Sequence, residues 1–203
     1  MSIKKNIDKE IQILGGISPL GFGMGLHIRF ASPLISLYTW PQAWQDHYTN
    51  NVYGLRDPMV AWAFAKQGVC RWNECPIPDP FSIIKQAAEF GLRYGATVSY
   101  GRISSRTIVG IARDDREFSL DELLQAQEVV SLLHNKAELP ESLTSAQREA
   151  LKLVSSGYRY AEAAASIGIS ESAFKLRLSS ARTRLLAKTT AEAVQRAKDY
   201  KLL

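Results

Sequence analysis

Cysteines, long apolar runs and export signals are scarce or absent in this sequence, and each absence excludes a class of protein. The two cysteines, Cys70 and Cys75, have no second pair or histidine cluster beside them, so we interpret them as reduced thiols rather than as a zinc site or a disulfide framework. No stretch approaches the roughly 18 unbroken apolar residues of a membrane span. Polar residues follow Lys5 where a signal peptide would need an apolar core. We therefore expect a cytoplasmic protein without a membrane segment or a metal.

Signatures of catalysis are also lacking. The sequence has no glycine-rich phosphate loop, nucleophile elbow or metal-ligand cluster, and its three histidines, His27, His47 and His134, are scattered along the chain. We expect a protein that is not an enzyme and that has no cofactor. The chain does have 203 residues, of which 46% are hydrophobic. This is enough to build two domains of unequal size.

Positive charge is concentrated toward the C-terminal end. Residues 1–141 carry 14 Lys and Arg against 15 Asp and Glu, a net charge of −1, whereas residues 142–203 carry 11 against 5, a net charge of +6. Such an asymmetry is typical of a chain in which one domain binds a polyanion and the other does not. A solvated basic helical surface would give the same charge. The pattern of helices in this segment is therefore needed to distinguish binding of a polyanion from a solvated surface.

The C-terminal segment carries the signals of several short helices. Thr144 and Gln147 predict a capping box at the start of the first. Gly157 follows its apolar positions where a left-handed C-terminal cap is expected. A second short helix is predicted over about residues 160–167. Gly168 then predicts a tight turn before the next helix.

The third and fourth helices complete this segment. Ser170 is the predicted N-cap of the third, and Thr189 with Glu192 predicts a capping box for the fourth. Two helices joined by a short turn, of which the second is basic, can place that second helix in the major groove of double-stranded DNA. One such helix contacts few base pairs, so we expect a homodimer. The expected DNA-binding residues are Ser170, Ser172, Lys175, Leu176, Arg177 and Arg182.

Residues 142–203 resemble the C-terminal DNA-binding domain of LuxR-type regulators. The positions that carry the resemblance are Leu143, Thr144, Arg148, Glu149, Gly157, Glu162, Ala164, Gly168, Ile169, Ser170, Glu171, Ala193 and Val194. Two places depart from the family pattern: Ala173-Phe174-Lys175 stands where Thr-Val-Lys is usual, and Arg177 occupies a position that is commonly His. These departures bear on the operator sequence, not on the fold.

The N-terminal part alternates between helical and strand patterns. Helices are predicted over residues 3–14, 44–54, from Asp57-Pro58 onward, 81–90 and 119–135, and strands over 22–30, 33–40, 96–102 and 107–113, with a turn at 31–33 and a proline-rich loop after Trp72. The predicted fold class is α+β. We expect an α/β/α sandwich with a mostly antiparallel sheet, followed by a small all-α helix-turn-helix domain of four helices.

An aromatic cluster in the N-terminal part resembles the signal-binding domain of LuxR-type quorum sensors, over about residues 22–132. Trp44, Tyr48, Asp57 with Pro58, and Trp72 have the spacing of that family, as does the stretch 90–95. The resemblance implies that the ligand is an N-acyl-homoserine lactone. It also implies that Trp44 donates its indole N–H to the lactone carbonyl, that Asp57 accepts the ligand amide N–H, and that Tyr48 and Trp72 wall the pocket. Core packing is the alternative interpretation of each aromatic residue, and a helix N-cap is that of Asp57.

Three features depart from that family. Trp40, which we include among the ligand-binding residues, stands where Tyr is common, and its bulk predicts a smaller pocket. Arg113 falls near the strand position where Ser or Thr commonly helps to bind the amide. About 21 residues precede the first strand, so we expect a helix of the usual leader to be missing. The ligand is thus expected to be a small amphiphile such as an N-acyl-homoserine lactone, another molecule, or none.

These patterns together predict a transcription regulator of the quorum-sensing type. The expected domains are a ligand-sensing domain at residues 1–135, a linker at 136–142 and a helix-turn-helix domain at 143–203. The expected partners are double-stranded DNA, a small amphiphilic signal and a second copy of the chain, with no membrane. The short leader motivates an alternative, in which an orphan or ligand-independent protein forms heterodimers with a full-length regulator and so antagonises it.

Overall fold

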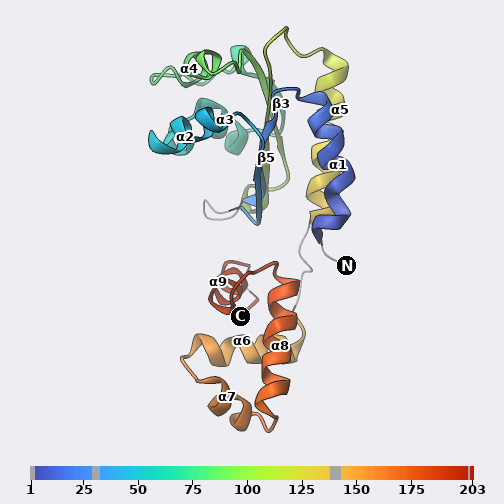
Figure 1. Cartoon of the computed structure of the whole chain (residues 1–203), viewed down its shortest axis with the longest axis vertical. Helices are drawn as coiled ribbons and strands as arrows, with labels where there is room; N and C mark the ends of the chain where they lie inside the picture. The colour runs from blue at the N-terminus through green and yellow to red at the C-terminus, as the bar shows by residue number, and fades with distance from the viewer. Residues whose placement is uncertain (1–2, 29–32, 138–142, 201) are drawn as a thin grey trace. The chain divides into compact units, whose positions relative to one another are not determined.

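The chain forms two compact units, Met1–Glu138 and Leu139–Leu203 (Figure 1). The computed structural model describes residues 3–28, 33–137, 143–200 and 202–203. Most of the predicted linker, residues 138–142, and most of the predicted turn at 31–33 lie outside the described residues. In the described part of the chain, every helix falls short of the length and apolar character that crossing a bilayer demands.

A five-stranded antiparallel sheet forms the middle layer of the first unit. Its strands are β1 (Phe22–Ile28), β2 (Ile35–Tyr38), β3 (Gly68–Arg71), β4 (Tyr94–Tyr100) and β5 (Arg106–Arg113), in the order β2-β1-β5-β4-β3. Strands β1 and β5, which are far apart in sequence, are neighbours in the sheet and pair Gly23 with Gly110. The predicted α+β class with an antiparallel sheet is confirmed.

Helices α1 (Ile3–Ile17) and α5 (Leu120–Ala137) lie side by side on one face of the sheet (Figure 1). Both follow a helical apolar period, and together with the sheet they enclose one core. Its fully buried members include Ile7, Leu14, Met24, Ile111, Val130 and Leu133.

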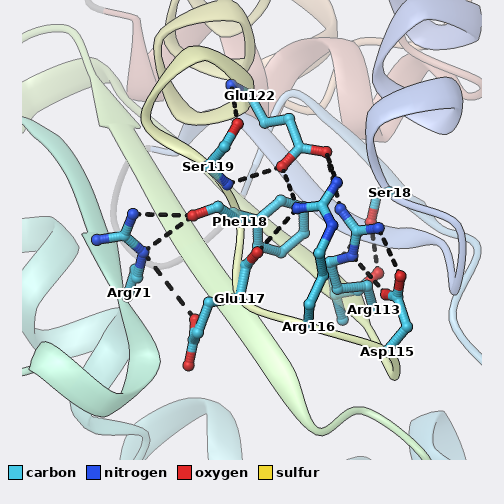
Figure 2. Close-up of polar contacts among 10 residues, drawn as sticks. Ser18, Arg71, Arg113, Asp115, Arg116, Glu117, Phe118, Ser119 and Glu122 are labelled. Carbon is cyan, nitrogen blue, oxygen red and sulfur yellow. Dashed lines mark hydrogen bonds and ion pairs between the residues drawn. The ribbon is translucent and has the colours of Figure 1, made fainter.

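A polar network fixes the start of α5 (Figure 2). Ser119 and Glu122 exchange hydrogen bonds as a capping box does, because each side chain accepts the backbone N–H of the other. The same Glu122 carboxylate accepts from Arg113 and Arg116, each at 2.8 Å. Arg71 of β3 donates to the carbonyl of Phe118 at 2.8 Å. These contacts join the ends of β3 and β5 to the first turn of α5.

The other face of the sheet carries α2 (Gln42–Asn50), α3 (Pro58–Ala65) and α4 (Ile83–Glu89) (Figure 1). Among the described residues of this unit, three short 3-10 helices join the other elements: η1 (Tyr53–Leu55), η2 (Trp72–Glu74) and η3 (Ile103–Ser105). A second, aromatic-rich core lies on this face, and it includes Trp44, Tyr53, Trp62, Trp72 and Leu92. The unit is therefore three layers deep, with a core on each side of the sheet.

The second unit consists, in its described part, of α6 (Ser145–Ser155), α7 (Tyr160–Ser166), α8 (Glu171–Arg184) and α9 (Thr190–Asp199). The predicted capping box of Thr144 and Gln147 is present, Gly157 has a positive φ of 87°, and Ser170 accepts the N–H of Ala173 as an N-cap. The core of this unit is made by Leu143, Ala150, Leu151, Ala163, Ala164, Phe174, Leu178, Ala181, Leu185, Ala193 and Ala197.

Three local predictions need correction. The four-residue strand β3 was not predicted, and α4 begins at Ile83 rather than at 81, because Ser82 takes a left-handed conformation with φ 52°. The box of Thr189 and Glu192 is only half formed. Thr189 accepts the N–H of Glu192, but the Glu192 carboxylate accepts the N–H of Lys188 instead of that of Thr189.

Candidate functional site

A cavity of about 570 Å³ lies in the first unit between the sheet and the helices α2 and α3. Its size falls within the range of small-molecule sites. All five predicted ligand-binding residues line it: Trp40, Trp44, Tyr48, Asp57 and Trp72. The structure therefore brings together side chains from α2, η2, the N-cap of α3 and the segment before α2, which lie up to 32 positions apart in the sequence.

Helix α2 places Trp44 and Tyr48 on the cavity wall. They are one helical turn apart, so they share a face, and their rings meet edge to face with centroids 5.6 Å apart. Trp44 is 3% exposed, yet no hydrogen bond joins its indole N–H to any other described residue. Packed aromatic rings thus hold the indole N–H of Trp44 at the cavity, where the described residues offer it no acceptor.

Asp57 carries out the N-cap role and also faces the cavity. Its Oδ1 accepts the backbone N–H of Met59 at 2.7 Å, which caps α3, and its Oδ2 accepts the hydroxyl of Tyr48 at 2.8 Å. Burial raises the pKa of the Asp57 carboxyl, although these two hydrogen bonds act in the opposite direction. Burial also raises the pKa of Tyr48, so the phenol stays a donor. A carboxylate has about four acceptor positions, which leaves capacity for a ligand N–H.

The rings of Trp72 and Trp40 pack against glycine residues of the sheet. Trp72 donates its indole N–H to the hydroxyl of Thr97 at 3.1 Å, and a Cβ on Gly95 would lie 2.2 Å from its ring. The indole N–H of Trp40 is buried and has no acceptor within the described residues. The cavity keeps about 570 Å³ even though Trp40 is present.

The sequence did not predict the part of the cavity wall that the strands form. Thr97, Gly23 and Gly110 line the cavity, and they can be identified only from the pairing register of the strands. Arg113, which falls near the strand position where Ser or Thr is common in the family, is not part of the lining. Its guanidinium binds Asp115 and Glu122 (Figure 2). In β5 the lining residues are Ile108 and Gly110, since alternate residues of a strand face opposite sides of the sheet.

The residues expected to bind DNA gather on α8 of the second unit. Ser172, Lys175 and Leu176 are exposed, with Leu176 at 71%, whereas Arg177 and Arg182 are half-buried. Lys175 pairs with Glu171 at 2.5 Å, and Arg177 lies 3.4 Å from Glu149 of α6. Because Phe174 and Leu178 anchor the opposite face of α8, this polar face stays at the surface of its unit.

Residues 24–137 match the family of autoinducer binding domains. Since the match covers more than half of the 203 residues, the chain belongs to this family. Its N-terminal unit is that of a LuxR-type quorum-sensing regulator.

Similar proteins are consistent with this assignment. The sequence is 25% identical over 181 residues to the HTH-type quorum-sensing regulator RhlR of Pseudomonas aeruginosa, covering 82% of this chain and 75% of RhlR. The fold resembles that of Escherichia coli SdiA, with a TM-score of 0.52 at 19% identity over 98% of this chain and 90% of SdiA. The structure of SdiA in complex with octanoyl-rac-glycerol gives a TM-score of 0.54 at 17% identity, over 98% of this chain and 89% of that one.

Proposed function

We propose that the chain is a DNA-binding transcription regulator whose N-terminal unit binds a small amphiphilic signal, with an N-acyl-homoserine lactone as the leading candidate. The observation that carries this proposal is the cavity of about 570 Å³ on which Trp40, Trp44, Tyr48, Asp57 and Trp72 converge. The domains expected from the sequence correspond to these roles: residues 1–135 sense the ligand and residues 143–203 bind DNA.

The polar groups of the cavity match the head of such a lactone. Trp44 offers an indole N–H that has no acceptor among the described residues, and Asp57 offers an acceptor. An N-acyl-homoserine lactone has one amide N–H and carbonyl oxygens on both its amide and its lactone. The amide N–H and the lactone carbonyl therefore each find a partner of the opposite kind, the N–H in Asp57 and the carbonyl in Trp44. The apolar remainder of the wall suits an acyl chain.

Thr97 adds a further polar group to this site. Its oxygen accepts the indole N–H of Trp72, so its own hydroxyl proton is directed away from that ring. Thr97 is 3% exposed and lines the cavity. We assign it the role of an additional donor to the ligand.

DNA binding is proposed for the second unit. Helices α7 and α8, joined by a turn at Gly168, form the two helices of a helix-turn-helix, and α8 is the one that enters the major groove. Ser170 and Ser172 lie at its N-terminal end, followed by Lys175, Leu176, Arg177 and Arg182. The net charge of +6 over residues 142–203 favours a polyanionic partner. A homodimer supplies two such helices, and we propose a cytoplasmic location, where the DNA is.

Two experiments on the full chain test the two halves of this proposal. The first is mass spectrometry of small molecules that co-purify from a lactone-producing host, with calorimetry of N-butanoyl to N-dodecanoyl homoserine lactones. The second is selection of DNA from a random pool, with and without the lactone that binds best, and size-exclusion chromatography of the complex. A protein that co-purifies with no small amphiphile and binds neither these lactones nor octanoyl glycerol contradicts the sensing half, and one that enriches no DNA sequence under any condition contradicts the DNA half.

The alternative function is antagonism of a full-length regulator through heterodimers. Neither the contacts of the described residues nor the similar proteins favour it. Co-elution with a full-length regulator, together with failure to bind DNA in the second experiment, would be the result that revives it.

A further inference from the structure

The ring of Trp40 lies directly on the backbone of the sheet. A Cβ built on Gly23 would lie 2.5 Å from Cζ3 of this ring, and one built on Gly110 would lie 3.0 Å from its Cζ2. Both distances are shorter than van der Waals contact. Gly23 and Gly110 are cross-strand partners in the pairing of β1 with β5, so the outer edge of the indole covers a flat area formed by two residues without side chains. We call these two residues and Trp40 the glycine seat.

These two glycines are needed for space and not for backbone conformation. The glycines with a left-handed φ are Gly21, Gly68, Gly91, Gly101, Gly157 and Gly168, and Gly23 and Gly110 are not among them. Any L residue could adopt the backbone of the seat. A side chain at position 23 or 110 would instead change the position of the indole ring of Trp40.

A methyl group at Gly23 or Gly110 would displace the indole ring, because it would occupy the place of the outer edge of that ring. Trp40 is part of the cavity lining, so a displacement of its ring changes the shape of the cavity wall. The two glycines therefore set the position of one ring of that wall.

We propose that the glycine seat determines ligand specificity, by setting how much of the cavity next to the sheet is free for an acyl ligand. The proposal rests on the proposed function of the cavity. Gly110 also lines the cavity, but in this scheme it acts through the ring of Trp40, so it is a positioning residue. Its effect must then depend on the size of the side chain at position 40.

A double-mutant cycle tests this dependence. Phenylalanine at position 40 lacks the outer edge of the indole, which is the part that contacts the two glycines. We expect Gly110→Ala to weaken binding of N-octanoyl homoserine lactone by about tenfold in the presence of Trp40, and by less than about twofold in the Trp40→Phe background. Gly16→Ala is the matched control, because Gly16 lies in α1 outside the cavity and a Cβ there has nothing within 4 Å. It should leave binding unchanged.

A second measurement follows the ring itself and needs no ligand. In protein labelled with 5-fluorotryptophan, the ¹⁹F resonance of Trp40 is the one that Trp40→Phe removes. Gly110→Ala should shift this resonance, and Gly16→Ala should not. If Gly110→Ala leaves the resonance in place, or weakens binding equally in both backgrounds, the glycine seat has no role in specificity. If the wild-type chain binds neither the lactone nor octanoyl glycerol, the proposed function fails, and the ¹⁹F shift alone decides whether the seat positions the ring.

Discussion

Replacing Asp57 with asparagine should separate ligand binding from helix capping. Asparagine is as good an N-cap as aspartate, so the first turn of α3, where Asp57 accepts the N–H of Met59, should persist. The negative charge that accepts the ligand amide is lost. A hydrogen bond to a charged group contributes about 1.5–3 kcal/mol, so the affinity for the best lactone should fall by about tenfold to about a hundredfold.

The same substitution should change how stability depends on pH. Burial raises the pKa of Asp57 above its ordinary value of 3.8, so the folded chain binds this proton more readily than the unfolded chain. Stability from this group is present below pH 3.8 and is lost as the pH rises through the raised pKa. Asp57→Asn removes this contribution, and its stability should therefore fall less than that of the wild type between pH 3.8 and neutrality.

Calorimetry with the lactone and urea unfolding at several pH values measure the two effects. Asp79→Asn is the matched control for the affinity measurement. Asp79 also accepts a backbone N–H at a helix start, from Ile84 of α4, but it does not line the cavity. It should change affinity by less than about twofold. Equal lactone affinity in wild type and Asp57→Asn would refute the assigned role of this carboxylate. A loss of affinity that accompanies unfolding of the variant would instead show that Asp57 acts through the fold alone.

Three further predictions concern other parts of the chain. Trp44→Phe keeps an aromatic ring in the cavity wall but removes one donor, so lactone affinity should fall by about three- to about tenfold in calorimetry; an unchanged affinity would contradict its role. Lys175→Ala and Arg177→Ala should each weaken DNA binding and lower the slope of log K against log salt by about 0.9, whereas Lys66→Ala in the first unit should not; two unchanged slopes would place the DNA contacts elsewhere. Burial, with the positive charges of His27 and Arg106 nearby, lowers the pKa of His134 from 6.5 to about 4. The free energy of unfolding should therefore decline as the pH falls from about 6.5 to about 4. Urea unfolding of His134→Gln should show a shallower decline.

The sequence was sufficient for those parts of the fold that depend on local chemistry. The capping box of Thr144, the N-cap at Ser170 and the long helix α5 are each set by residues within a few positions of one another, and the structure has them. Strand β3 was missed because it has only four residues and begins at Gly68, so no alternation could be seen. The start of α4 was misplaced because the left-handed conformation of Ser82 has no local signal.

The resemblance to LuxR-type quorum sensors predicted one part of the candidate site. The resemblance supplied Trp44, Tyr48, Asp57 and Trp72, and all of them line the cavity. It could not supply Thr97 or the glycine seat, because these depend on which strands are neighbours and in which register. A shift of register by one residue turns a strand residue to the other face, so strand residues of the wall cannot be assigned before the register is known.

The contact of Trp40 with two glycines couples positions that are far apart in the sequence. With alanine at position 23 or 110, the ring would meet a methyl group at 3.0 Å or less unless it moved. The side chains that positions 23 and 110 can accept without moving a neighbour therefore depend on the residue at position 40, although the three positions span 88 residues of sequence.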